Sequence, residues 1–405
     1  MTGVERTEIA IVGAGILGLA TAYRLLERRP DTRIVILERE ADVATHQSGH
    51  NSGVLHAGLY YAPGSLKARL CVQGKREVEA FATDHGIPFE RCGKVVVALS
   101  EDEMPRFEAL RQRAQANGVP GLEVIGRERL REIEPNVAGI RALWSPGTGI
   151  IDFRRVALAL ADVVRTRGAR IDTSRQVTAI RRTADGVLLQ TRRGDLLADR
   201  VIACAGLWAD RVAAMTGDRA PERIVPFRGD YYTVTPDTRS LVRGLVYPVP
   251  DPRFPFLGIH FTKRIDGELW AGPNAVLAFA RAGYRRRDVD LRDLADSLRN
   301  RGFLRLAARF WRRGLVEQWR DISKRAFTAE LRRYVPAIRD DQLVFGPSGV
   351  RAQAIDPDGS MVEDFRLGGD DRVLHVRNAP SPAATASLAI GSVLAETAVE
   401  RFGLR

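Results

Sequence analysis

The stretch EIAIVGAGILGLATAYRLLERRPDTRIVILERE, residues 8–40, decides the fold. A run of β-forming residues (9–12) leads into three glycines, and an amphipathic pattern then predicts a helix over about 16–28. A proline turn follows, and a second strand over 34–37 ends at Glu38. Strand, glycine turn, helix, strand and terminal acid in this order are typical of a dinucleotide-binding βαβ unit.

Each glycine of this turn has its own task. Gly13 permits the tight turn, Gly15 lets the backbone approach a diphosphate, and Gly18 lets the helix pack closely on the strand. We expect the diphosphate at the helix N-terminus, where unpaired N–H groups and the helix dipole favour anions. Glu38 lies where a ribose hydroxyl needs an acceptor.

The composition indicates a globular protein large enough for two domains. The chain has 405 residues, of which 45% are hydrophobic and 28% are charged. Its three cysteines are widely spaced and suggest neither a disulfide framework nor a zinc site, so no metal is expected and a cytoplasmic location is favoured. No segment approaches the roughly 18 apolar residues needed to cross a bilayer.

We expect the cofactor to be FAD rather than a nicotinamide. The sequence has one dinucleotide fingerprint, but a strand and helix at its C-terminal end return to the same domain, which suggests a long cofactor enclosed along its length. A helix N-terminus at 381–385, with Ser381 as N-cap, would stabilise negative charge on the reduced flavin. The predicted fold class is α/β. It consists of a discontinuous Rossmann-like FAD-binding domain (1–85, 145–215 and 340–405) and an inserted, mainly antiparallel-β substrate domain (86–144 and 216–339).

Positive charge is concentrated in one part of the chain. The net charge is +12, and residues 281–333 carry 16 Lys/Arg against 7 Asp/Glu. This part includes a predicted basic helical segment, 285–333, without a zinc-finger or helix-turn-helix pattern, so nucleic acid is not expected as a partner. An arginine-flanked aromatic stripe over 302–315 would suit peripheral contact with the inner face of the cell membrane. The alternative is a helix docked on the protein core with solvated arginines.

The loop THQSGHNSGVLHAGLYYAPGSLKARL, residues 45–70, holds three of the six histidines. With PFRGDYY (226–232), LGIHFTKRIDGELWAGPNAVLA (257–278) and HVRNAPSPAATAS (375–387), it closely resembles the L-2-hydroxyglutarate dehydrogenases/oxidases. These enzymes belong to the D-amino-acid-oxidase-like FAD superfamily, and the resemblance runs from about residue 8 to 400. It implies FAD-linked oxidation of L-2-hydroxyglutarate to 2-oxoglutarate, with electrons passed to a quinone or to oxygen. One departure is the turn Asn-Ala-Pro-Ser-Pro, where many superfamily relatives place several glycines.

The candidate cofactor contacts come from six separate parts of the chain. They are Gly13, Gly15, Ile16, Gly18, Glu38, Arg39, Ser48, His50, Asn51, Ser52, Val177, Ala205, Gly206, Trp208, Pro382, Ala383, Ala384 and Thr385. The position of His50 is similar to that of a flavin-proximal histidine in some amine-oxidising relatives.

Oxidation of a 2-hydroxy acid also needs a base for the hydroxyl proton, and histidine suits this near neutral pH. His56 is the first candidate and His260 the second. A substrate with two carboxylates needs two cationic anchors, and tyrosines can add hydrogen bonds. The candidate substrate contacts are Tyr60, Tyr61, Arg228, Tyr231, Lys263 and Arg351.

Two other functions remain open from the sequence. A flavin amine oxidase acting on glycine- or sarcosine-like amino acids would share the fold and the cofactor. A nucleotide-binding module without redox turnover is the alternative from a different class.

Overall fold

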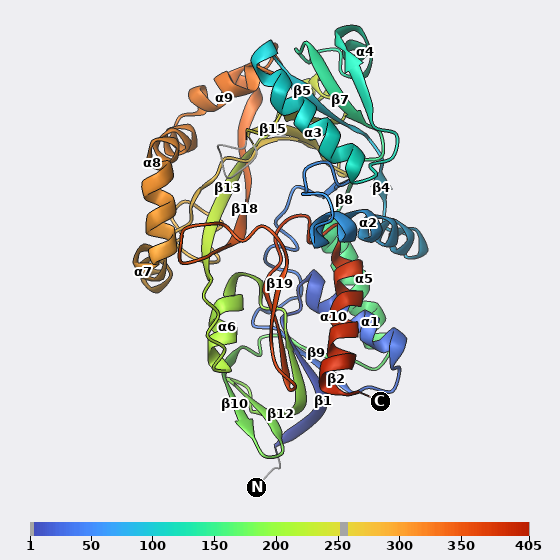
Figure 1. Cartoon of the computed structure of the whole chain (residues 1–405), viewed down its shortest axis with the longest axis vertical. Coiled ribbons are helices and arrows are strands. Elements are labelled where there is room, and N and C mark those ends of the chain that lie inside the picture. The colour runs from blue at the N-terminus through green and yellow to red at the C-terminus, as the bar shows by residue number, and fades with distance from the viewer. Residues whose placement is uncertain (1–3, 252–257, 405) are drawn as a thin grey trace.

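The computed structural model describes residues 4–251 and 258–404. Figure 1 shows two halves, each built around a sheet, with both ends of the chain in the lower half. The first three residues and the last residue of the predicted FAD-binding domain, and residues 252–257 of the predicted substrate domain, lie outside the described residues. In the described part, no helix combines the length and the apolar character needed to cross a membrane.

The lower half contains an eight-stranded sheet with a parallel centre, in which β20, β12, β1, β2 and β9 pair in that order. Antiparallel strands extend it beyond β12 and β20. The strands are β1 (Glu5–Val12), β2 (Ile34–Leu37), β9 (Arg170–Asp172), β10 (Val177–Thr183), β11 (Gly186–Thr191), β12 (Leu196–Ala203), β19 (Arg366–Gly369) and β20 (Val373–Asn378). The βαβ unit read from residues 8–40 is therefore confirmed, and with it the Rossmann-like fold.

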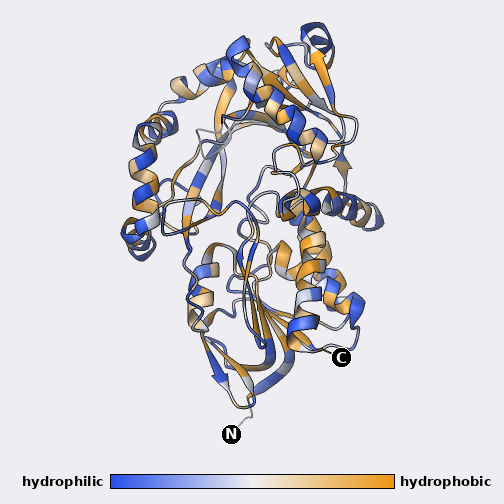
Figure 2. Ribbon diagram, viewed as in Figure 1, coloured by the Kyte–Doolittle hydropathy of each residue, from blue (hydrophilic) through white to orange (hydrophobic). Residues whose placement is uncertain are grey.

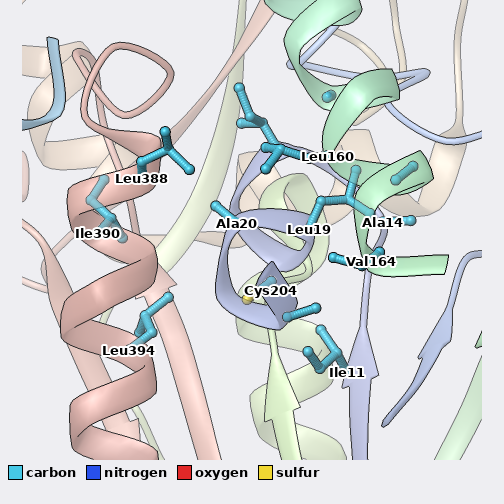
Figure 3. Close-up of a cluster of buried hydrophobic side chains, with 14 of the residues drawn as sticks. Ile11, Ala14, Leu19, Ala20, Leu160, Val164, Cys204, Leu388, Ile390 and Leu394 are labelled. Atoms are coloured by element: carbon cyan, nitrogen blue, oxygen red, sulfur yellow. The ribbon is translucent and has the colours of Figure 1, made fainter. Parts of the chain in front are cut away.

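Helix α1 (Ile16–Arg28) lies between α5 (Phe153–Thr166) and α10 (Ser387–Phe402), as Figure 3 shows. Leu19 and Ala20 are fully buried there, and the α1–α10 contact is close enough that a Cβ at Gly391 would lie 2.7 Å from Ala20 O. The first and last helices of the chain thus share one core. Two more helices, α2 (Leu66–Asp84) and α6 (Ala209–Met215), pack in this half.

The upper half contains a nine-stranded sheet that is antiparallel except for the pair β14–β5. Its strands are β5 (Lys94–Ala98), β6 (Glu123–Gly126), β7 (Arg141–Ser145), β13 (Arg223–Val234), β14 (Leu245–Pro248), β15 (His260–Lys263), β16 (Leu269–Gly272), β17 (Val276–Leu277) and β18 (Leu343–Ile355). Helices α3 (Met104–Ala116) and α4 (Arg127–Ile133) pack on it, and a small antiparallel sheet comprises β3 (Val54–Leu55), β4 (Phe89–Glu90) and β8 (Gly149–Ile151).

The segment 343–355 differs from the sequence prediction, whereas the segment 285–333 agrees with it. β18 pairs with β13 from Arg223↔Ile355 to Val234↔Leu343, so residues 343–355 belong to the upper sheet although 340–405 was assigned to the FAD-binding domain. The segment 285–333 is helical as predicted over most of its length, in three helices, α7 (Leu291–Arg299), α8 (Arg301–Ile322) and α9 (Lys324–Arg332). They follow one side of the molecule beside β13 and β18 (Figure 1).

Candidate active site

The glycine turn after β1 brings two strands and a helix into contact. The Gly13 N–H donates to Leu37 O at 2.8 Å, and Gly13 has a φ of +104°, which favours glycine. A Cβ at Gly13 would lie 2.5 Å from Cys204 O, and a Cβ at Gly18 would lie 2.0 Å from Gly13 O. Glycine is therefore required at both positions, for turn geometry at the first and for close packing at the second.

The N-terminus of α1 is arranged to receive an anion. Gly15 precedes the helix without a side-chain cap, and the Ile16 N–H donates to Ser48 Oγ at 2.9 Å. The Ala14 N–H donates to one oxygen of Glu38 at 2.8 Å, and the other oxygen accepts a backbone N–H two residues on. The Glu38 carboxylate is thus fixed beside the turn, with lone pairs left for a ribose hydroxyl, and the helix dipole favours a diphosphate. These groups fit the dinucleotide part of FAD.

Segments from the middle of the chain meet this turn. The Arg39 guanidinium lies 4.0 Å from the centre of the Trp208 ring, and Trp208 packs with Val177 and Ala205 in one apolar cluster. Gly206 begins the short 3-10 turn that carries Trp208. The structure therefore brings these five candidate cofactor residues together.

The first part of the 45–70 loop folds against the upper sheet. The His50 ring stacks on Tyr284 at 4.0 Å, and its Nδ1 donates to Ser348 O on β18 at 3.2 Å. Asn51 fixes the loop by donating to Ser48 O at 2.8 Å and accepting the Gly53 N–H at 2.9 Å, with Ser52 between them. Burial lowers the pKa of His50. His50 thus links the cofactor turn to the upper sheet.

The C-terminal turn joins the same loop through one hydroxyl group. Thr385 Oγ1 donates to Val54 O at 3.1 Å and accepts the His56 N–H at 3.2 Å. Pro382, Ala383 and Ala384 form hydrogen-bonded turns, and α10 begins only at Ser387. Ser381 is therefore not the N-cap of the last helix, because successive turns separate it from the helix start. Thr385 instead holds the backbone of His56.

The side chains of Lys94, Tyr247 and His260 lie on the same face of the upper sheet. Leu245 of β14 pairs with Lys94 on one side and with Thr262 on the other, and two residues further along the Tyr247 ring stacks on His260 at 3.8 Å. Lys94 Nζ lies 4.0 Å from the centre of the Tyr247 ring. His260 Nδ1 lies 2.8 Å from Gly258 O and must donate to it, which leaves Nε2 as an acceptor.

The second part of the loop adds a histidine and two tyrosines to this face. Burial lowers the pKa of His56 well below its usual value, and the nearby Lys94 and His260 lower it further. The Tyr60 ring centre lies 5.2 Å from Lys94 Nζ, and burial, followed by the nearby Cys71 and Tyr60, raises the pKa of Tyr61 well above its usual value. Burial, followed by Lys94 and Arg351, lowers the pKa of His260 to about 3. Both histidines are therefore neutral near pH 7, as a base requires.

Strands β13 and β18 add Tyr231 and Arg351 to this group of side chains. Burial raises the pKa of Tyr231, and Arg351 opposes that shift. Burial lowers the pKa of Arg351, and Tyr231 and Tyr247 oppose that shift. His56, His260, Tyr60, Tyr61, Tyr231 and Arg351 thus form one cluster with Lys94 and Tyr247, which we call the sheet-face cluster.

Two predicted substrate contacts lie elsewhere. Lys263 follows Thr262 on β15, so its side chain points to the opposite face, where Nζ pairs with Glu90 at 2.6 Å. Arg228 is buried between Asp230, at 2.9 Å, and Asp321 of α8, at 3.5 Å. Both cations are paired with carboxylates, so the structure does not bring them into the sheet-face cluster.

Lys94 and Tyr247 are the cluster members that the sequence did not reveal. Lys94 stands at the start of the run KVVVA, where a lysine usually marks an exposed strand end. Its position becomes significant only when β14 pairs beside β5 and buries its side chain completely. A lysine followed directly by four buried apolar residues was the only available signal.

Comparison with known proteins identifies the family. Residues 8–397 match the model of the FAD dependent oxidoreductase family (DAO). The chain is 46% identical to the mitochondrial L-2-hydroxyglutarate dehydrogenase of Nematostella vectensis, over 99% of this chain and 92% of that protein. It is 42% identical to the L-2-hydroxyglutarate dehydrogenase of Indibacter alkaliphilus, over 98% and 99% of the two chains.

A solved structure, FAD-bound L-alpha-glycerophosphate oxidase from Mycoplasma pneumoniae, superposes with a TM-score of 0.80 at 22% identity, covering 99% of this chain and 96% of the other. That likeness supports the fold. The matched family depends on FAD, and the close-packed glycine turn of this chain fits the same cofactor. The chain therefore belongs to the FAD-dependent oxidoreductases of the DAO family and, within them, to the L-2-hydroxyglutarate dehydrogenases.

Proposed function

We propose that the protein oxidises L-2-hydroxyglutarate to 2-oxoglutarate with FAD. The observation that carries this proposal is the sheet-face cluster: two neutral histidines beside Lys94 and Arg351, joined through Thr385 to the cofactor-binding segments. The relatives of the preceding section, named for this substrate, support the choice of acid.

The residues of the cluster would divide the chemistry. FAD, when bound, supplies the two-electron acceptor for the hydride that leaves C2. We assign the hydroxyl proton to His56, because its backbone is tied directly to the C-terminal turn by Thr385. His260 would accept a hydrogen bond at Nε2, since its Nδ1 is committed to Gly258 O. The cations would hold carboxylates, and the tyrosines would exclude water and add hydrogen bonds.

Anaerobic mixing tests the reaction. L-2-hydroxyglutarate should bleach the flavin absorbance of the purified protein, and glycine and sarcosine should not. Bleaching by the amino acids alone would favour an amine oxidase instead. A protein that binds FAD but is bleached by neither class would be a nucleotide-binding module.

We further propose that the electrons pass to a quinone at an anionic membrane surface, which α8 contacts. Its residues Phe303, Leu306 and Phe310 pack against Phe227 and Ile355 of the upper sheet, so this part of the predicted stripe is docked on the core. A second stripe with helical spacing faces outward. It consists of Leu304 (48% exposed), Trp311 (56%), Leu315 (61%), Trp319 (62%) and Ile322 (70%).

Hydrophobic and hydrophilic residues alternate along α8 in Figure 2. Arg301 and Arg305 lie before a kink at Phe310, and Arg312 lies just after it, so basic residues accompany the exposed apolar side chains on both parts of α8, a pattern suited to anionic lipid. The protein should co-sediment with phosphatidylglycerol-containing vesicles, and the pair Trp311→Ser and Trp319→Ser should abolish this. Val124→Ser on β6, exposed but distant in sequence, is the matched control. Reoxidation by a soluble quinone should be faster than by air, and equal vesicle binding by both variants would contradict the membrane contact.

A further inference from the structure

Lys94 is a buried cation without the partner that burial normally demands. Its side chain is fully enclosed, with 0% exposure, at the first residue of β5. Within residues 4–251 and 258–404, its Nζ has no hydrogen-bond partner. Buried charges in proteins are ordinarily paired, because an ammonium loses its hydration when it leaves water. An interior lysine that the described residues leave unsatisfied is therefore suited to bind an anionic ligand.

Aromatic rings enclose this ammonium. Tyr247 and Tyr60 present their rings at 4.0 and 5.2 Å, and the Tyr60 hydroxyl is itself enclosed without a hydrogen-bond partner among the described residues. Ring faces attract a cation, but they do not accept the three hydrogen bonds that an ammonium offers. The Lys94 ammonium, which can donate three hydrogen bonds, and the Tyr60 hydroxyl, which can donate and accept, are thus both left unsatisfied by the described residues.

A second cation lies close to the same ring pair. Arg351 acts electrostatically on Tyr247 and on His260, the two rings that stack on each other beside Lys94. Lys94 and Arg351 therefore border a single group of aromatic and histidine rings. Two cations around one reaction site suit a substrate that carries two carboxylates.

We propose that Lys94 Nζ binds one carboxylate of the substrate and makes the site selective for dicarboxylic 2-hydroxy acids, with the Tyr60 ring turning aside to admit it. This inference rests on the proposed function and names the residue that sets its substrate class. Arg351 is placed to meet the other carboxylate, next to the histidines that handle the proton.

The loop carrying Tyr60 is built so that the ring can move while the backbone stays. Arg113 of α3 donates to Tyr60 O at 3.1 Å. Asn117, directly after α3, donates to Gly58 O at 2.9 Å and to Tyr61 O at 2.8 Å. The carbonyl groups on both sides of the ring are therefore anchored. The proposal therefore needs only rotation about the side-chain bonds of Tyr60, with the backbone held in place.

The first test compares two substrates in the FAD-loaded enzyme. L-2-hydroxyglutarate and L-2-hydroxypentanoate have the same chain length, but the second lacks the distal carboxylate. Lys94→Met should lower kcat/KM for the dicarboxylate by about 100-fold, mainly through KM, and should change the value for the monocarboxylate by less than about threefold. Lys263→Met, a lysine on the opposite face, is the control and should change neither. Lys94→Gln repeats the test with a polar side chain if the methionine variant folds poorly.

The second test measures protons rather than turnover. Burial lowers the pKa of unliganded Lys94 to about 7, so the amine is mostly neutral at pH 8 and must gain a proton to hold a carboxylate. Calorimetry with 2-oxoglutarate in two buffers of different ionisation enthalpy should show uptake of close to one proton per ligand in the wild type. This uptake should be absent in Lys94→Met.

The outcomes separate this inference from the proposed function. If the wild type does not oxidise L-2-hydroxyglutarate at all, the proposed function fails. If the wild type oxidises it but Lys94→Met keeps the preference for the dicarboxylate, only the role of Lys94 fails. An equal loss with both substrates, or unchanged proton uptake, would mean that Lys94 acts on the fold or on His56 and His260 rather than on a carboxylate.

Discussion

Arg228 and Lys94 are both buried cations of the upper sheet, but their surroundings are opposite. Arg228 lies among carboxylates, with Asp230 at 2.9 Å and Asp321 at 3.5 Å, and Asn274 donates to Asp321 at 2.6 Å. Lys94 lies among rings and histidines and has no hydrogen-bond partner in the described chain. A paired buried cation completes the fold, whereas an unpaired one is held ready for a ligand. The sequence could not distinguish them, since it predicted the first as a substrate contact and passed over the second.

Removing the paired cation should have the largest effect on stability. Arg228→Met would leave Asp230 and Asp321 with the exposed Arg286, 3.4 Å from each, as their remaining arginine among the described residues, and burial with Asp321 already raises the pKa of Asp230. We expect a loss of about 3–5 kcal/mol in the free energy of unfolding, measured with urea. If the loss is below about 1 kcal/mol, Arg228 is not the structural member of the pair.

Removing the unpaired cation should stabilise the protein instead. Lys94→Met should raise the free energy of unfolding at pH 7 by about 1–4 kcal/mol, because an apolar side chain replaces a buried ammonium. The folded pKa of about 7 lies below the ordinary lysine value, so between pH 7 and about 10 the unfolded state binds more protons. The wild type therefore gains stability over this range relative to the variant, and the advantage of Lys94→Met should shrink. A variant less stable than the wild type would contradict the contrast.

His56, beside Lys94, tests whether the sheet-face cluster takes part in the reaction. His56→Ala should reduce kcat at least about tenfold while FAD stays bound, because the proton acceptor is lost. In the wild type, kcat/KM should decline on the acid side only below the ordinary histidine pKa, since burial and Lys94 lower the pKa of His56. Stopped-flow reduction across pH 4–9 measures both effects, and unchanged turnover would remove His56 from the mechanism.

An exposed cation should show the smallest effect. Lys263 pairs with Glu90 near the surface, where both side chains keep about a third or more of their area in solvent. Lys263→Met should change the free energy of unfolding by less than about 1 kcal/mol and leave kcat and KM unchanged. A large rise in KM would return Lys263 to the substrate site and contradict the separation of paired cations from the sheet-face cluster.

The fold was more predictable than the cluster because its signals are local. Gly13, Gly18 and Glu38 lie within one βαβ unit, and each position is dictated by its own turn or strand. Lys94, Tyr247 and His260 meet only through strand pairing between β5, β14 and β15, which no short stretch of sequence specifies. His56 and His260 were predicted from the reaction and the family resemblance rather than from packing. Ser381 shows the limit of local reasoning, because a plausible cap residue lies six positions before the helix that it was expected to start.

The double hydrogen bond of Thr385 has a consequence for the order in which the protein matures. Its hydroxyl donates to Val54 O and accepts the His56 N–H, two groups about 330 residues earlier in the chain. A ribosome releases the N-terminal portion long before this threonine is made, so a nascent chain can form its first strands but cannot fasten the histidine loop. Catalytic competence would thus follow the synthesis of Thr385, and a chain cut short before this residue would be partly folded but unable to position His56.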